Sequence, residues 1–287
     1  MIRDYVKLCK VRISLFSVLS ALAGFLLSGF QSDARMLSVI LGVFCLACGS
    51  SGLNQFQEKD IDKLMSRTRN RPIPAGNIYP HRALYFSLVL ICLGVFVLFA
   101  GAGLAASALG LSAIIWYNGV YTYLKRVTPF AVIPGSLIGA IPPAIGWLAG
   151  GGTLLDPKLL TLCFFFFIWQ IPHFWLFLLT YGEEYKEAGL PSFKEVFTGA
   201  SFLRIIYHWI VATAVFSLLI PLYGLVHSPI TKYSLLGVSL WLVWQGIYVM
   251  RGNQFDRYVV FRKVNRYMFV VLFLLSLDGL HVRLIGM

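Results

Sequence analysis

Residues 36–71 read MLSVILGVFCLACGSSGLNQFQEKDIDKLMSRTRNR, and this stretch decides the class of fold. Its first part, residues 36–56, contains no charged side chain, and an apolar helix needs about 20 residues to cross the hydrocarbon core of a bilayer. The charges then come together, from Glu58 to Arg71. The stretch therefore predicts a transmembrane helix that ends in a charged segment at one membrane face.

The composition extends this interpretation to the whole chain. Only 13% of the 287 residues are charged and 58% are hydrophobic, whereas a soluble domain carries about 25% charged residues. No polar or low-complexity linker divides the chain, so we expect one domain, residues 1–287, with an all-α fold. It should be a polytopic membrane protein with about nine transmembrane helices. The predicted spans are residues 13–30, 36–56, 84–102, 104–121, 130–150, 159–180, 204–226, 233–250 and 267–286.

The positive charges indicate how these spans are oriented. Nearly all of the 24 Lys and Arg residues lie in alternate connecting segments, namely 1–12, 57–83, 122–129, 181–204 and 251–266. The exceptions are Arg35, Lys158, Lys232 and Arg283. Because Lys and Arg are enriched in cytoplasmic loops, nine spans with a cytoplasmic N-terminus fit this pattern. The net charge of +12 is then explained by topology and contact with anionic lipid, and no nucleic-acid partner is expected.

A first acidic cluster follows the second predicted span. Asn54, Glu58 and Asp62 are spaced by four residues and would share one face of a helix, where their oxygens suit a hard cation such as Mg²⁺. Asp60 would point away from that face, to cap the helix or to serve a second ion. Arg67, Arg69 and Arg71 follow with forked donors suited to phosphate. The same residues would also suit a solvated, positively charged loop.

Two further groups would lie at the same membrane face. Glu183, Glu184 and Glu187 follow the sixth predicted span. Glu183 and Glu187 are four residues apart, and like charges at that spacing on a helix repel unless a cation or base lies between them. Together the two acidic clusters could hold two metal ions on either side of one diphosphate. Tyr121 and Lys125, one turn apart, could bind the leaving diphosphate, or they could be an interfacial Tyr and a snorkelling Lys.

Polar residues also interrupt the apolar spans. His173 lies in the run Trp169-Gln-Ile-Pro-His-Phe-Trp175, and ionisable residues inside a span are candidates for function. It could contact a porphyrin, shuttle a proton or bond to a neighbouring helix. Asp278, near the outer face, is expected to pair with Arg283.

Several of these motifs resemble those of a known family. Asn54…Glu58…Asp62 followed by Arg67-Thr-x-x-Arg71-Pro72, and Tyr121-x-x-x-Lys125, resemble the motifs of the intramembrane UbiA-type prenyltransferases. Within them, the stretches around Asp60–Thr68, Tyr123–Pro129, Gly139–Trp147 and Trp169–Phe174 resemble the protoheme IX farnesyltransferase branch, which makes heme O. The resemblance runs from about residue 10 to the C-terminus. In this chain Glu58 stands where the superfamily often has Asp, and a glutamate set stands where other branches have Asp-x-x-x-Asp.

The resemblance implies nine helices around a central cavity that opens toward the membrane. It implies farnesyl diphosphate and heme B as substrates, the lipid bilayer as solvent and Mg²⁺ as cofactor. The implied ligands of the metal are Asn54, Glu58, Asp60, Asp62, Glu183, Glu184 and Glu187. Arg67, Arg71, Tyr121 and Lys125 would bind diphosphate, and Asn54, Glu58, Asp62, Lys125 and His173 would take part in catalysis. A heme A synthase or a terminal oxidase assembly route is the expected downstream partner.

Two alternative functions remain open at this point. A prenyltransferase for an aromatic quinone precursor would use the same diphosphate site. A transporter would place its acids near the bilayer midplane rather than at one face. The expected location is a bacterial inner membrane, because no Arg- and Ser-rich presequence precedes the first span.

Overall fold

The structure is a computed structural model that describes residues 2–29, 32–191, 193, 196–250 and 256–285. These described residues form helices and connecting turns, without a β-strand. The elements are α1 (Ile2–Leu8), α2 (Val11–Leu27), α3 (Asp33–Gln57), α4 (Lys59–Leu64), α5 (Pro80–Ala102), α6 (Leu104–Ile114), the π-helix η1 (Ile115–Tyr121), α7 (Thr122–Leu124), the 3₁₀ turn η2 (Pro129–Ala131), α8 (Val132–Gly135), α9 (Leu137–Ala149), α10 (Pro157–Glu187), α11 (Gly199–Leu222), α12 (Pro229–Met250) and α13 (Arg257–Ile285).

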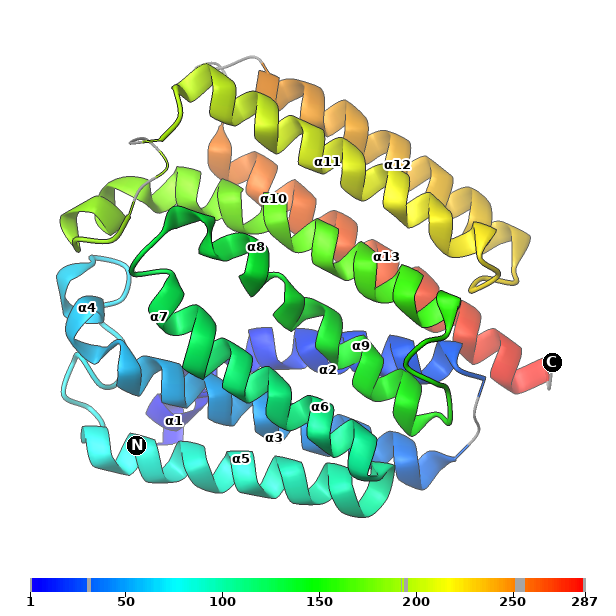
Figure 1. The fold of residues 1–287 in the computed structure, drawn as a ribbon, viewed down its shortest axis with the longest axis horizontal. Helices are drawn as coiled ribbons and strands as arrows, with labels where there is room; N and C mark the ends of the chain where they lie inside the picture. The colour runs from blue at the N-terminus through cyan, green and yellow to red at the C-terminus, as the bar shows by residue number, and fades with distance from the viewer. Residues whose placement is uncertain (1, 30–31, 192, 194–195, 251–255, 286–287) are drawn as a thin grey trace.

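The predicted all-α membrane fold is confirmed. Within the part of the chain that the structure describes, eight helices or helix groups are long and apolar enough to cross a membrane. The ninth is the bent pair α1 and α2, whose axes differ by 51°. The bend falls at Lys10, which has a φ of 45° and is the only described non-glycine residue with positive φ. The two termini lie at opposite ends of the helix bundle, as an odd number of crossings requires (Figure 1).

Local sequence explains two of the boundaries between helices. Gly103 separates α5 from α6, and its φ of 91° is a conformation that a residue with a Cβ rarely adopts. The apolar run from residue 84 to residue 121 is therefore two spans and not one. At the other end of α5, Pro80 occupies the first turn, where its missing N–H costs no helical hydrogen bond.

Small residues allow α2 and α9 to approach closely. A Cβ at Gly24 would overlap the backbone carbonyl of Pro143, and a Cβ at Gly146 would overlap that of Ala21. Lipid offers no hydrophobic driving force between helices, so close backbone packing of this kind stabilises membrane bundles. It fixes the N-terminal helices against the middle of the chain.

The bundle places its charged segments together. The segment that contains α4, the short helix α7 and the C-terminal end of α10 all lie at the left end in Figure 1. This is the single face predicted from the charges. A separate apolar groove of about 450 Å³ lies between α9, α10 and α11, and Leu137, Phe164, Phe167 and Phe216 are among its lining residues.

One predicted pairing is wrong. The carboxylate of the buried Asp278 accepts hydrogen bonds from the backbone N–H groups of His227 and Ser228, each at 2.9 Å. Arg283 instead pairs with Asp33 on α3. The reason is helical geometry: Asp278 faces the loop between α11 and α12, whereas Arg283, more than one turn later on α13, faces α3.

Candidate functional site

The first acidic cluster is built at a break between two helices. α3 ends at Gln57, Glu58 has φ −105° and ψ 7°, and α4 begins at Lys59. The predicted single helix through Asn54 and Asp62 is therefore interrupted. The backbone hydrogen bond from the N–H of Asp62 to the carbonyl of Glu58, at 2.8 Å, keeps the two segments in near-helical register. The side chains of Asn54 and Glu58 remain in contact, with Nδ2 of Asn54 at 3.1 Å from Oε2 of Glu58.

Glu58 forms an ion pair with Lys125, which follows α7. The Nζ of Lys125 lies 2.6 Å from Oε1 and 2.7 Å from Oε2 of the carboxylate, and only 5% of Glu58 is exposed. Burial acts to raise the pKa of Glu58, but the ammonium of Lys125 outweighs it and holds that pKa below its usual value. Burial likewise acts to lower the pKa of Lys125, and the carboxylate of Glu58 outweighs it, so the pKa of Lys125 is raised. Both groups are therefore charged at neutral pH.

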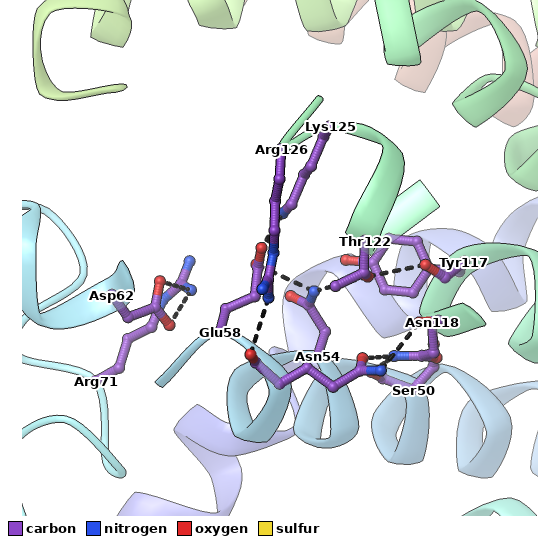
Figure 2. A network of polar contacts seen from close by, with 11 residues as sticks. Ser50, Asn54, Glu58, Asp62, Arg71, Tyr117, Asn118, Thr122, Lys125 and Arg126 are labelled. Carbon is purple, nitrogen blue, oxygen red and sulfur yellow. Dashed lines mark hydrogen bonds and ion pairs between the residues drawn. The ribbon is translucent and has the colours of Figure 1, made fainter. Parts of the chain in front are cut away.

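A polar network joins the end of α3 to the helix that carries Lys125 (Figure 2). Asn54 donates to Thr122 Oγ1 at 3.2 Å, and Thr122 donates to the carbonyl of Tyr117 at 2.8 Å. One turn deeper, Ser50 donates to Asn118 at 2.7 Å. Residues 115–121 form a π-helix, a distortion that is frequent at functional sites. These hydrogen bonds fix the position from which Lys125 reaches Glu58.

Asp62 forms a second, separate ion pair. Only 1% of Asp62 is exposed, and both of its carboxylate oxygens accept from Nη1 of Arg71, at 2.8 and 2.7 Å. Thr68, also buried, donates to the backbone carbonyl of Asp62 at 2.8 Å and closes the intervening loop. Asp60 points away, as predicted: its side chain is 74% exposed and it pairs with Lys59 and Lys63.

The second acidic cluster meets the first through Arg67. The backbone N–H of Arg67 donates to Glu184 Oε2 at 3.2 Å, and its guanidinium lies over the rings of Phe177 and Tyr181 on α10. Glu184 is half-buried, whereas Glu183 and Glu187 are exposed. Glu184 therefore lies against the arginine loop.

Tyr121 is buried beside the Glu58–Lys125 pair. Its ring stacks on Tyr117 at 5.7 Å between centroids, and Nζ of Lys125 lies 5.7 Å from the centroid of Tyr121. On its other side, Phe174 of α10 lies 6.1 Å away. Tyr121 therefore connects the charged end of the site to the aromatic interior.

Sequence reasoning missed Lys10 as part of this site. It lies at the bend between α1 and α2, in the left-handed conformation noted above. Four charged side chains act on its ammonium, those of Arg71, Lys125, Glu58 and Asp62. The positive φ is a strain that is commonly kept at functional sites, but it has no signature in a sequence.

His173 lies deeper in the bundle, next to a residue that sequence reasoning also missed. Its Nδ1 is 2.6 Å from Oδ1 of Asn265 on α13. The imidazole is surrounded by the rings of Trp169, Phe174 and Phe261, with centroids 5.0 to 5.2 Å away. His173 therefore bonds to a neighbouring helix, and its role toward a porphyrin or a proton stays a prediction.

The side-chain oxygens at the break after α3 suit a hard cation that arrives with a substrate. The side-chain NH₂ group of Asn54 donates hydrogen bonds to Glu58 and Thr122, which leaves its Oδ1 available to bind a cation. Within the described residues, no three His, Cys, Asp or Glu side chains are close enough together to hold a metal ion. Mg²⁺ is usually held by one or two carboxylates plus substrate phosphates, so the residues present fit that ion.

Comparison with known proteins agrees with this arrangement. Residues 17–273 match the UbiA prenyltransferase family. The chain is 40% identical over 228 residues to a protoheme IX farnesyltransferase of Geobacter sulfurreducens, and this alignment covers 78% of this chain and 83% of that protein. It is 35% identical over 221 residues to a protoheme IX farnesyltransferase of Legionella pneumophila, which covers 76% and 74% of the two chains.

The fold has solved relatives at lower identity. A digeranylgeranylglyceryl phosphate synthase superimposes with a TM-score of 0.78 at 17% identity, over 97% of this chain and 98% of the other. A UbiA homologue from Archaeoglobus fulgidus, bound to GPP and Mg²⁺, superimposes with a TM-score of 0.73 at 16% identity, over 98% and 99%. From its helices, its charged end and these similarities, the chain is a multi-pass membrane protein and belongs to the UbiA prenyltransferase family.

Proposed function

We propose that this protein transfers a farnesyl group from farnesyl diphosphate to a vinyl group of heme B, with addition of water, to give heme O. The observation that carries the diphosphate chemistry is the pair of buried carboxylate–cation contacts, Glu58–Lys125 and Asp62–Arg71, at one end of the bundle. The choice of acceptor is supported by the relatives named protoheme IX farnesyltransferase, which cover more than two thirds of the chain.

The charged end binds the leaving group in this proposal. Lys125, Arg71 and Arg67 face the diphosphate and neutralise the charge that grows as it departs, which is electrostatic stabilisation of a transition state. Mg²⁺, held by Asn54, Glu58 and Asp62 together with the substrate phosphates, supplies further positive charge when it is bound. Glu184 is the member of the second cluster best placed to join it. Asp60, Glu183 and Glu187 remain predicted ligands that lie farther out.

The reaction itself takes place against the aromatic interior. The C–O bond of farnesyl diphosphate breaks and its electron pair leaves with the diphosphate. The outer carbon of the heme vinyl group bonds to the allylic carbon, and water adds to the inner carbon and releases a proton. Tyr121 and Phe174 lie between Lys125 and His173, where ring faces stabilise positive charge and exclude water.

Membrane context completes the proposal. We place the protein in a bacterial inner membrane, with the charged end on the cytoplasmic side. Heme O would pass to a heme A synthase or to terminal oxidase assembly. The helices themselves support a multi-pass membrane protein, and the choice of membrane and of downstream partner is part of the proposal.

The test is heme extraction and mass spectrometry after incubation of the purified chain in nanodiscs with heme B, farnesyl diphosphate and Mg²⁺. We expect heme O, lost on chelation with EDTA and restored by added Mg²⁺. Prenylation of an added aromatic acid, without heme O, would move the protein to the quinone branch. Absence of diphosphate release with any acceptor would remove the prenyltransferase assignment and favour the transporter.

A further inference from the structure

The imidazole of His173 has one ring nitrogen bound and the other free. Nδ1 lies 2.6 Å from Oδ1 of Asn265, and an amide oxygen only accepts, so Nδ1 carries the proton. Nε2 then holds a lone pair. Among the described residues Nε2 has no hydrogen-bond partner, and it is not fully sealed from solvent. The structure thus presents an accessible basic nitrogen inside the bundle.

The surroundings leave Nε2 to solvent or to a ligand. The ring is packed by Trp169, Phe174 and Phe261, none of which accepts or donates to Nε2. A His that donates Nδ1–H to an oxygen and directs Nε2 outward is the arrangement typical of a metal-ligating imidazole.

Two contacts between α10 and α13 hold the imidazole in place. Besides the His173–Asn265 bond, Nε1 of Trp169 donates to the carbonyl of Val264 at 3.3 Å, one residue before Asn265. Pro172 precedes His173 within α10 and removes one helical hydrogen bond there, which makes a kink easier. The ring orientation is therefore set by the partner helix.

The position of His173 relates this nitrogen to the diphosphate site. His173, Phe174, Tyr121 and Lys125 form a continuous row, with separations of 5.2, 6.1 and 5.7 Å between successive groups. The ring that carries Nε2 and the ammonium of the diphosphate site are therefore linked by two aromatic side chains.

We propose that Nε2 of His173 is an axial ligand to the iron of the heme substrate, and that Asn265 is the positioning residue that fixes its tautomer and direction. The proposal rests on the proposed function, because it takes heme B as the acceptor. The iron sits at the porphyrin centre and the vinyl groups at the rim. Ligation at His173 thereby anchors the acceptor while a vinyl group faces the farnesyl diphosphate.

The test reads the iron–nitrogen bond and not only the activity. The full-length protein in nanodiscs is loaded with heme B without farnesyl diphosphate, reduced, and examined by resonance Raman spectroscopy for the iron–histidine stretch. We expect the band in the wild type and its loss in His173→Ala, with an imidazole-bound spectrum regained when free imidazole is added. His208→Ala is the matched control, because His208 is exposed on α11 and, among the described residues, its Nδ1 bonds to the carbonyl of Arg204 in its own helix.

Asn265 has its own pair of variants. Asn265→Leu removes the acceptor and should weaken heme B binding roughly 10- to 100-fold, the usual effect of losing such a partner. Asn265→Asp keeps an acceptor and adds charge, so the iron–histidine stretch should move to higher frequency. The KM for heme B should rise in Asn265→Leu while that for farnesyl diphosphate stays unchanged, and binding of farnesyl diphosphate with Mg²⁺ reports correct folding.

The outcomes separate this proposal from the function. Retention of the band in a folded His173→Ala variant would overturn the ligation, and unchanged frequencies in both Asn265 variants would overturn the positioning role. If the wild type makes heme O while His173→Ala keeps the band, only the ligand is wrong. If the wild type shows the His173-dependent band but makes no heme O, the proposed function fails and the heme site stands.

Discussion

Replacing Arg71 with Met should destabilise the protein strongly, because it removes the partner of a buried charge. Asp62 is 1% exposed, and both of its carboxylate oxygens are bound by Arg71 at 2.8 and 2.7 Å. With so little contact with solvent, the carboxylate is left as a buried charge without a partner when the guanidinium is removed. Breaking a buried ion pair from one side typically costs about 3–5 kcal/mol, and we expect Arg71→Met to fall in that range.

A double substitution separates the ion pair from the rest of the site. Asp62→Asn combined with Arg71→Met removes both charges together, so no unpaired charge stays buried. We expect the double variant to be more stable than the sum of the single effects predicts, with a coupling of about 2 kcal/mol. Activity should not recover with stability, because both side chains are proposed to face the substrate.

The assay is reversible unfolding of each variant in mixed detergent micelles, followed by helical circular dichroism, beside heme O production. Arg82→Met is the matched control: Arg82 is exposed on α5 over the ring of Tyr79, and its loss should change stability by no more than about 0.5 kcal/mol. The reasoning is refuted if Arg71→Met costs under about 1 kcal/mol, or if the double variant shows strictly additive losses.

Three further predictions follow from other contacts. Glu58→Gln should lower heme O production at least about 100-fold, because it weakens both the metal site and the ion pair with Lys125. Asp4→Asn, at the same end of the bundle, should leave the rate within about twofold. Equal effects of the two variants in a kinetic assay would contradict the assignment of Glu58 to the site. Because the pKa of Glu58 is lowered and that of Lys125 raised, their pair should stabilise the protein from above the usual carboxyl pKa of 4.5 up to the usual ammonium pKa of 10.5. Stability measured against pH should fall as the pH drops through the lowered pKa of Glu58, and this part of the acid loss should be absent in Glu58→Gln. Gly146→Ala should force α9 away from Ala21 and destabilise the bundle, whereas Gly237→Ala, with open space at its Cβ, should be neutral or gain up to about 1 kcal/mol; thermal unfolding of both would reveal an error if their order were reversed.

Much of the fold follows from local patterns alone. Apolar runs of spanning length mark the helices because lipid cannot satisfy a free backbone, and the uneven Lys and Arg distribution gathers the loops on one face. Some helices end at residues other than those predicted, because the sequence signals at helix ends were overlooked. α10, for example, continues to Glu187, seven residues past the predicted end of that span, and therefore brings Glu184 to the arginine loop.

The site could be predicted in its components but not in its pairings. The sequence by itself determined that this is a helical membrane protein with acids and arginines at one end, because those properties depend on composition and spacing within single segments. Only the tertiary structure decided that Glu58 pairs with Lys125, that Lys10 bends into the site, and that Asn265 binds His173. Each of these contacts joins segments far apart in the chain, and their partners are set by how the helices pack, which no local pattern of residues encodes.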